Sequence, residues 1–473
     1  MANLDNILKA SGLQPAEQEL LEELLGVFKA NEGKNEKRRL YYEDKVPTKP
    51  LGYSCPPEIV NGVNTKTGWA AKAVDMLAAR SRFEGFVFED GAPDGFNQMM
   101  MDNRIGAAYS MALPSELVHG CGFWTVERGS SADEPVAVIN YHNAQSAAAV
   151  WDYRRRRIRA GFAICDYKRF GAKSQPIPSM VALYTDTAVV VITREDRTHW
   201  MAEYRWHSMG RPMMEPMVYR FREDKPFGRS RITPAVMGYV DDVQRELFNT
   251  ILQSEIYSMP QKWMRNLTDE QFDAVMENRM HYYTTQVLAM TSGADGDPVD
   301  LGMFQPATME PHLEVIDKLA NLMAAETCLP VATFGVAGNG YTSSDALRAS
   351  SDDLVLEANV MNARNGESLR NVAMMAMAVQ SNVPMSALDD NQKSVSVCWH
   401  DTEMLTAAQA TDSAIKIASV VPEYPHTEVF WERLGYSESE RRRVESQIEG
   451  VDAKQALMVT LFGADNGEQE ATA

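Results

Sequence analysis

Hydrophobic residues recur at steps of three and four along much of the chain, which is the spacing of one helix face. Near the N-terminus, Leu21, Leu24, Leu25 and Phe28 follow Pro15 at this spacing, so residues 1–40 are predicted to be largely helical. The same reasoning predicts helices over 68–80, 97–113, 234–258, 309–327 and 343–380, and further helices after 401.

Between about 121 and 221 the pattern changes to short runs of β-branched and aromatic residues, separated by turn residues. The clearest runs are 136–140, 158–164, 181–184 and 188–192. Runs of this kind predict an antiparallel β region. Together with the helices, they predict a chain of the α+β fold class.

The helix predicted over 234–258 has clear limits. Thr233 can cap it, a proline stands at its first position, and Pro260 prevents its continuation. A second helix, 309–327, begins and ends beside prolines in the same way. Because both flank the insert 259–308, we expect the two helices to run antiparallel and to hold the insert away from the body.

The insert is predicted to be a small α/β unit. A strand-like segment, 261–265, precedes a helix that Thr268 opens, with Gln271 three residues on in a capping-box pattern. The remaining strands of the insert are predicted around 286–291 and 299–304.

A glycine-rich loop, 334–341, follows the second helix. Its spacing does not match G-x-G-x-x-G, and no Lys-Ser/Thr pair follows, so the pattern favours a flexible connection over a phosphate-binding loop. Residues 342–345 then form a cap for the long helix 343–380. Gly366 predicts a kink in this helix, and Ser368 interrupts its apolar heptad.

The net charge of the chain disfavours some classes of function. The chain has 46 Lys and Arg against 65 Asp and Glu, a net charge of −19. Because phosphate affinity comes mainly from Lys and Arg, this balance disfavours a tight duplex-binding protein, although not one through which DNA slides. No apolar stretch reaches the ~20 residues that span a bilayer, and no signal-peptide core is present, so we expect neither membrane association nor secretion.

Candidate catalytic groups are few. His119 and Cys121 could supply a base and a nucleophile, but closeness in sequence does not create that geometry. His199 and His207 lack a companion cysteine or carboxylate pattern, and the five cysteines form no C-x-x-C pair, so no metal site is predicted. The chain is predicted not to be an enzyme and to need no cofactor.

The run Arg154–Arg159 is the one strongly basic feature. In an exposed hairpin it would discourage edge pairing or meet acidic neighbours, and the alternative is a contact with phosphate or another subunit. The acidic pairs Asp241-Asp242 and Asp352-Asp353 fall on predicted helices, where adjacent side chains point about 100° apart. They are therefore interpreted as solvated faces rather than as a two-metal site.

At five places the sequence resembles the portal proteins of tailed bacteriophages, the head-to-tail connector family. The matching segments are Gly228–Pro234, Thr268–Phe272, Met309–Glu314, Leu329–Gly335 and Tyr341–Arg348. The order of these motifs, rather than any single one, carries the resemblance. It covers about 20–460 and is most specific over 225–380.

The resemblance implies a portal fold with a β-rich and helical wing, an antiparallel two-helix stem, a small α/β clip, a long wing helix and a helical crown. By position these parts would be a wing at 1–230, stem helices at 231–258 and 309–327, a clip at 259–308, a tunnel loop at 328–342, a long wing helix with its following segment at 343–398, and a crown region with a disordered tail at 399–473.

The resemblance further implies a homo-oligomeric ring, a dodecamer, at one capsid vertex of the virion, assembled in the host cytoplasm. DNA would pass through its channel during packaging and ejection, without sequence specificity. The implied partners are double-stranded DNA, the terminase large subunit, scaffolding and major capsid proteins, and head-completion or adaptor proteins. ATP hydrolysis would belong to the terminase, in agreement with the missing phosphate-binding loop.

Three sets of candidate site residues follow. The tunnel loop would face DNA with Val336, Gly338, Asn339, Gly340 and Tyr341. Carboxylates that repel phosphate would keep friction low in the stem, and the candidates are Asp241, Glu246, Glu314 and Asp317. The clip would face the terminase with Lys262, Arg265, Asp269 and Glu270.

Two other classes stay open at this point. One is a soluble enzyme with a β-rich domain and a helical lid, which would use Cys121 or the region of His199 and His207. The other is a capsid or tail connector component without a DNA channel. A ring would be far heavier than the 52.8 kDa chain and would show a central hole, which distinguishes it from the enzyme.

Overall fold

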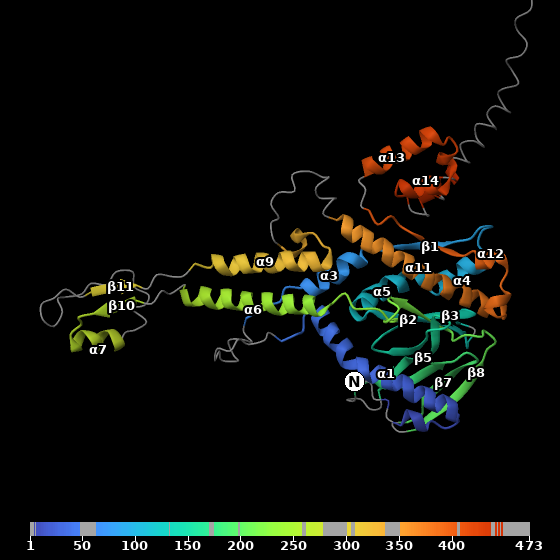
Figure 1. Cartoon of the computed structure of the whole chain (residues 1–473), viewed down its shortest axis with the longest axis horizontal. Coiled ribbons are helices and arrows are strands. Elements are labelled where there is room, and N and C mark those ends of the chain that lie inside the picture. Colours follow the sequence, from blue (N-terminus) through green and yellow to red (C-terminus); the bar gives the residue numbers. More distant parts are fainter. Residues whose placement is uncertain are drawn as a thin grey trace, which may run out of the picture. The chain divides into compact units, whose positions relative to one another are not determined.

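The computed structural model describes residues 4–47, 63–257, 262–277, 300–303, 308–335, 351–403 and 407–447, apart from residues 5, 132, 170–174, 197–198, 437–439, 442 and 445. The chain divides into two compact units, Met1–Cys398 and Trp399–Ala473. Helices and strands are both abundant, which confirms the mixed helix and strand class (Figure 1).

The larger sheet of the first unit has five antiparallel strands in chain order. They are β4 (Ala147–Asp152), β5 (Arg157–Lys168), β6 (Ile177–Tyr184), β7 (Ala188–Arg194) and β8 (Trp200–Trp206). Three of the predicted runs lie in β5, β6 and β7, so the short runs of β-branched and aromatic residues located these strands correctly. One face of this sheet is apolar and needs a cover.

Helix α1 (Pro15–Tyr42) provides that cover. Its residues Leu21, Leu24, Leu25 and Phe28 are buried and pack with the inward side chains of the sheet. The Phe28 ring meets Phe162 of β5 edge to face, with the ring centres 5.4 Å apart. The spacing predicted near the N-terminus therefore belongs to the core face of α1.

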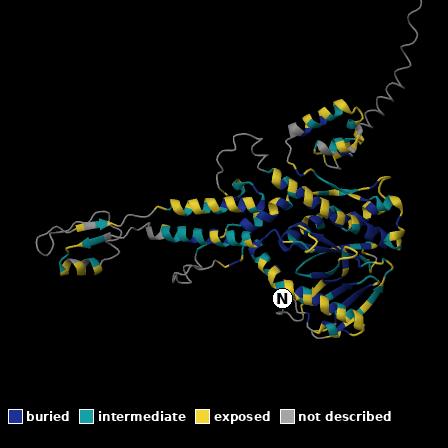
Figure 2. Cartoon of the chain, viewed as in Figure 1, coloured by how far each residue is buried: buried dark blue, intermediate teal, exposed yellow. Residues whose placement is uncertain are grey.

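A second, three-stranded antiparallel sheet has the order β3-β2-β9. Its strands are β2 (Cys121–Arg128), β3 (Ala137–Asn143) and β9 (Met214–Val218). Helices α5 (Ile105–His119) and α11 (Asp352–Ser381) pack against it. Figure 2 shows α11 with a buried side toward the sheet and an exposed side away from it.

The remaining small elements of the first unit are α3 (Trp69–Ala78), α4 (Phe96–Asp102), α12 (Asp390–Lys393), and strand β1 (Phe83–Val87), which pairs with β12 (Ser396–Trp399). Short 3-10 turns add η1 (Ile7–Lys9), η2 (Val331–Phe334) and η3 (Met385–Ala387).

The prediction of one helix over 97–113 is wrong, because α4 and α5 are separate helices. Arg104 has a left-handed φ of 49°, which breaks the helix between them. The Asn103 side chain fastens the break to β3: its Nδ2 donates to the Ala137 carbonyl at 2.8 Å, and its Oδ1 accepts from the Ile139 N–H at 2.7 Å. Such side-chain bonds favour a turn over a continuous helix.

Helices α6 (Pro234–Tyr257) and α9 (Glu310–Thr327) form where the sequence predicts them, and they pack side by side (Figure 1). Thr233, at the start of α6, bonds Glu326 at the end of α9 over 2.8 Å. Glu246, farther along α6, bonds His312 near the start of α9, also over 2.8 Å. These two contacts show that the helices run antiparallel.

Between α6 and α9 in the chain lie β10 (Lys262–Arg265), α7 (Asp269–Glu277) and β11 (Asp300–Met303). Strands β10 and β11 pair antiparallel, with Trp263 opposite Gly302. A Cβ at Gly302 would lie 2.2 Å from the Trp263 ring, so only glycine fits beneath the indole. The strand expected at 286–291 lies outside the described residues.

The long helix is described from Asp352 onward, and the expected first part with its cap, 342–350, lies outside the described residues. The second unit contains α13 (Ala407–Val420), η4 (Tyr424–His426) and α14 (Glu428–Arg433), so its described part is helical. In the part of the chain that the structure describes, none of the helices has the length and apolarity needed to cross a bilayer.

Candidate functional site

One buried guanidinium connects α3, α9 and α11 just before α6 begins. Arg231 is 2 % exposed. Its Nη1 donates to the Tyr219 hydroxyl at 2.8 Å and to Glu357 Oε2 of α11 at 2.5 Å. Its Nη2 donates to the Thr327 carbonyl of α9 at 2.5 Å, and its Nε donates to the Ala73 carbonyl of α3. We call Arg231, Tyr219 and Glu357, with these two carbonyls, the junction.

Glu357 is the negative partner of the junction. It also forms an ion pair with Arg220 at 2.7 Å and accepts a hydrogen bond from the Tyr219 hydroxyl. Burial alone would raise the pKa of Glu357, but the facing Arg231 guanidinium and the Tyr219 hydrogen bond leave this pKa below its ordinary value. A buried charge pair is stabilising only when its remaining donors and acceptors are satisfied, and the junction meets that condition.

Two glycines let the segment before Arg231 approach the body closely. Gly228 has a φ of 64°, and a Cβ there would lie 2.1 Å from the Tyr219 carbonyl oxygen. Gly120, at the end of α5, has a φ of 96°, and its Cβ would lie 2.8 Å from the Arg229 carbonyl carbon. Both positions therefore require glycine for backbone conformation and for space.

Thr233 has two roles at the start of α6. Its Oγ1 accepts a hydrogen bond from the Val236 N–H at 3.2 Å, which confirms the predicted helix cap. The same hydroxyl donates to Glu326 of α9 at 2.8 Å. The segment Gly228–Pro234, which carries part of the sequence resemblance, is therefore the place where both helices are attached to the body.

A second polar cluster is buried where α5 meets α11. Glu116 is fully buried and accepts from Asn365 Nδ2 at 3.0 Å. The Tyr109 hydroxyl lies 3.3 Å from the same nitrogen and 2.7 Å from Ser81 Oγ, which donates to Asn362. Burial raises the pKa of Glu116 to about 8, so this carboxyl group holds its proton at neutral pH.

Glu357, Glu116, Asn362 and Asn365 were not among the residues predicted from the sequence. The signal was present in the long helix, where polar residues stand at positions that face the core. Ser368, which interrupts the apolar heptad, is one of them, and its hydroxyl donates to the Pro216 carbonyl at 2.7 Å. A buried polar residue in an apolar face indicates a specific partner, but the sequence does not say which one.

The acidic candidates on α6 and α9 separate into two groups. Asp241 accepts from the buried Tyr41 hydroxyl at 2.8 Å, and Glu246 contacts His312, so both have partners within the subunit. Glu314 and Asp317 are exposed on α9.

The clip candidates lie on β10 and α7. Lys262 belongs to β10, and Arg265 is exposed with its guanidinium 4.9 Å from the centre of the Trp263 ring. Asp269 and Glu270 are exposed in the first turn of α7. The tunnel-loop candidates Val336, Gly338, Asn339, Gly340 and Tyr341 lie outside the described residues.

The residues considered for catalysis are poorly suited to it. Burial raises the pKa of the Cys121 thiol to about 12 and lowers that of the His119 imidazole to about 4, so the thiol stays protonated. His199 is exposed and contacts Asp196 at 2.7 Å, while burial lowers the pKa of His207. Among the described residues, no group of three or more His, Cys, Asp and Glu side chains is placed to hold a metal ion.

The basic run begins in the exposed turn between β4 and β5. Arg155 lies 3.3 Å from Asp186, and Arg159 of β5 forms an ion pair with Glu23 of α1. Two members of the run therefore meet acidic neighbours, as one of the two interpretations expects.

Comparison with known proteins gives the family resemblance. The portal protein of Mycobacterium phage L5 is 22 % identical over 463 residues, which cover 94 % of this chain and 91 % of that protein. The portal protein of Mycobacterium phage D29 is 22 % identical over 460 residues, with the same coverage. The predicted resemblance to phage portal proteins is confirmed. No protein-family profile matches the chain.

Solved structures with a similar chain come from gene transfer agent particles. One, from the neck of an empty particle, has a TM-score of 0.46 and 12 % identity, and covers 81 % of this chain and 94 % of that chain. Another, from the neck of a native particle computed with C12 symmetry, has a TM-score of 0.44 and 12 % identity, with coverages of 84 % and 98 %. The portal resemblance therefore rests on the curated relatives and their coverage.

Proposed function

We propose that this chain forms a portal ring at one vertex of a phage capsid, with a channel through which DNA is packaged and later ejected. The observation that carries the proposal is the similarity to curated portal proteins along nearly the whole chain. A role limited to one shared domain would not require matching segments from end to end.

In this proposal, the antiparallel pair α6 and α9 is the stem, and β10, α7 and β11 are the clip. The sheets with α1, α5 and α11 are the wing, and the second unit, from Trp399, belongs to the crown. The junction supports this division, because it connects the proposed stem helices to the proposed wing. Arg231 and Thr233 attach the bases of both helices to the body by charge-assisted and neutral hydrogen bonds, so a load on the stem would pass to the wing.

The exposed carboxylates Glu314 and Asp317 are our candidates for the channel lining. A duplex that slides past carboxylates is repelled rather than held, which keeps resistance low. Asp241 and Glu246 would contribute less, because each is already engaged within the subunit. The loop residues 336–341 would contact the DNA at the base of the stem.

The expected partners are those of a capsid vertex. The exposed Arg265, Asp269 and Glu270 would meet the terminase during packaging and head-completion proteins afterwards. Scaffolding and major capsid proteins would contact the outside of the wing and stem. Assembly in the host cytoplasm and twelve subunits per ring belong to this proposal as well.

The mass of the purified assembly and its image from above test the proposal. We expect particles many times heavier than the 52.8 kDa chain, with a central hole, on negative-stain grids and in native mass spectrometry. Assembly should be tried with and without the scaffolding protein. Subunits that remain monomeric in both conditions, or that form compact particles without a hole, would overturn it.

Deletion of Val336–Asn339 tests the loop separately from the ring. We expect rings of normal mass and appearance but reduced packaging or retention of DNA in complemented phage. Normal packaging and retention by the deletion variant would remove the loop from the proposed channel while leaving the ring in place.

A further inference from the structure

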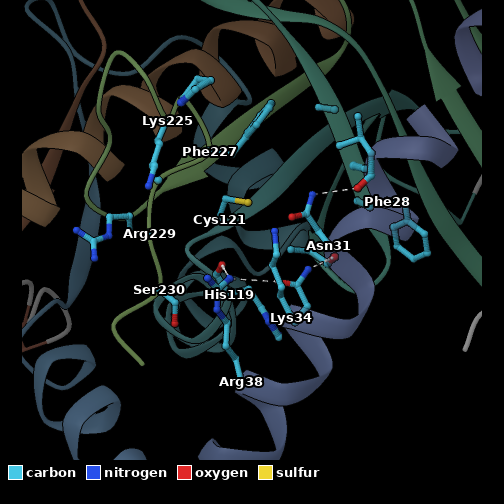
Figure 3. Close-up of a pocket in the computed structure, with 18 of the residues that line it drawn as sticks. Phe28, Asn31, Lys34, Arg38, His119, Cys121, Lys225, Phe227, Arg229 and Ser230 are labelled. Atoms are coloured by element: carbon cyan, nitrogen blue, oxygen red, sulfur yellow. Dashed lines mark hydrogen bonds between the residues drawn. The ribbon is translucent and has the colours of Figure 1, made fainter. Parts of the chain in front are cut away.

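A basic cavity of about 520 Å³ opens between α1 and the segment 225–234 (Figure 3). Lys34 and Arg38 of α1 line one side, and Lys225 and Arg229 line the other, with Cys121 between them. The described residues that line the cavity include no Asp or Glu, although acidic residues outnumber basic ones by 65 to 46 in the chain. The cavity is therefore a local concentration of positive charge.

Three of the four cations are free to bind a ligand. The side chains of Lys34, Lys225 and Arg229 are exposed, and none has an ion pair or hydrogen bond with another described residue. Arg38 is half-buried and donates to the His119 carbonyl at 2.9 Å. His119 is 7 % exposed, and its Nδ1 has no hydrogen-bond partner among the described residues.

Apolar side chains complete the wall. Phe28, Phe123 and Phe227 lie among the lining residues, beside the cations. A ligand that suits this wall carries both carboxylates and apolar groups, because the carboxylates pair with the cations while the apolar groups cover the rings. A duplex offers phosphates to the cations, but its backbone has no apolar side chains to cover the rings.

We propose that the cavity receives the first turns of α11 from a second copy of this chain. Asp352, Leu356 and Val360 recur at steps of four, so they form one stripe on α11, and Asp353 lies beside it. All four are exposed, with Leu356 at 65 % and Val360 at 60 %. This stripe, which we call the acidic–apolar stripe, has carboxylates to pair with the cations of the cavity and apolar groups to cover its rings.

The acidic–apolar stripe is a better occupant of the cavity than other acidic surfaces, because it lies at the same height along the subunit as the cavity. This step rests on the proposed ring, whose axis would run along the stem, so that neighbouring copies meet at equal heights. The cavity includes Ser230 and Ile232, and Arg231 between them binds Glu357 of α11, so the cavity and the stripe lie at the same height. Glu314 lies about 20 Å farther along α9, at 1.5 Å per residue from the end of the helix at Thr327.

The two surfaces also face different sides of the segment before α6. Ser230 and Ile232 line the cavity, whereas the Arg231 side chain leaves it and reaches α11. Figure 1 shows α1 and α11 on opposite sides of the three-stranded sheet. One surface on each side of a subunit is the arrangement that a head-to-tail ring requires, because each copy then offers its stripe to the cavity of the next.

Reversing the charges on each surface separately, and then on both surfaces together, tests the inference. In the full chain, Lys225→Glu with Arg229→Glu should abolish the ring and leave monomers, and Asp352→Lys with Asp353→Lys should do the same. The four substitutions together exchange the charges across the contact and should restore rings of wild-type mass. Circular dichroism of each variant should match the wild type, which excludes misfolding as the cause.

A matched control changes net charge by the same amount elsewhere. Lys9→Glu with Lys29→Glu alters two exposed lysines outside the cavity and should leave the ring intact. If the wild type forms rings and the Lys225→Glu/Arg229→Glu variant forms them equally well, the inference is wrong and the proposed function stands. Failure of the fourfold variant to recover rings would remove α11 as the occupant.

A DNA-binding measurement distinguishes a nucleic-acid ligand. Rings of the Lys225→Glu/Arg229→Glu variant that stay intact but lose affinity for a short duplex in low salt would show that the cavity binds phosphate, which overturns the proposal. A wild type that never assembles would instead contradict the proposed function, before the cavity comes into question.

Discussion

Replacing Arg231 by methionine would remove the guanidinium from the junction while keeping most of the volume of the side chain. Glu357 would lose its buried partner at 2.5 Å but keep Arg220 at 2.7 Å, and the Thr327 and Ala73 carbonyls would each lose a donor. The variant therefore tests whether this one side chain holds the helices of the proposed stem to the body.

The expected loss is large for a single substitution. Removing one partner of a buried ion pair costs about 3–5 kcal/mol, and each buried carbonyl left without a donor costs about 1–3 kcal/mol. Because Arg220 still compensates part of the Glu357 charge, we expect the free energy of unfolding to fall by about 3–5 kcal/mol in total.

The loss should depend on pH in a defined direction. The folded-state pKa of Glu357 lies below its ordinary value, so its pairing contributes stability above the unfolded pKa of 4.5 and loses it as the pH falls through the folded value. The difference between wild type and Arg231→Met should therefore be largest at neutral pH and should shrink in acid.

Urea unfolding of unassembled subunits, followed by tryptophan fluorescence at neutral and acidic pH, measures both effects. Arg154→Met is a matched control, because Arg154 is exposed in the turn between β4 and β5 and should change stability by no more than about 0.5 kcal/mol. A loss below about 1 kcal/mol for Arg231→Met at neutral pH would refute the reasoning, since the junction would then contribute no more than a surface pair.

Three further predictions use other parts of the chain. Burial raises the pKa of Glu116 to about 8, so unfolding at neutral pH releases its proton, and the free energy of unfolding should fall by up to about 5 kcal/mol as the pH rises from 4.5 to 8. In urea unfolding, Glu116→Gln should lose this dependence on pH, and an unchanged dependence would contradict the buried carboxyl. In the same assay, Gly228→Ala should lower the free energy of unfolding by at least about 2 kcal/mol. Gly238→Ala, which adds a methyl group to open space in α6, should raise it by about 0.5–1 kcal/mol, and equal effects would contradict the packing at Gly228. Glu314→Lys with Asp317→Lys should slow DNA packaging without preventing ring assembly, and wild-type packaging rates would show that these carboxylates do not face the DNA.

Local rules were sufficient for most helices and strands. A capping threonine, a proline in the first turn and apolar residues at steps of three and four are properties of neighbouring residues, and they located α6 within one residue at its C-terminal end. The same rules missed the break between α4 and α5, because the bonds that stabilise it come from Asn103 to a strand more than thirty positions away.

The candidate site residues, too, could be predicted only in part from the sequence. The segment Gly228–Pro234 and the acidic residues of α6 and α9 could be predicted from the sequence, but Glu246 could not be distinguished from Glu314. Both stand on amphipathic helices with similar charge patterns. Only the packing of α6 against α9 places Glu246 beside His312 and leaves Glu314 exposed, because exposure depends on which helix face a neighbour covers.

The sequence alone thus determined the order of most elements, the limits of α6 and the acidic balance of the chain, because each depends on residues close together or on composition. Tertiary structure decided which charges are buried and with what partner. Arg231 and Glu357 are 126 positions apart, and Glu116 and Asn365 are 249 apart. No periodic pattern connects such residues, because a buried charge is stabilised only by the particular groups that folding brings to it.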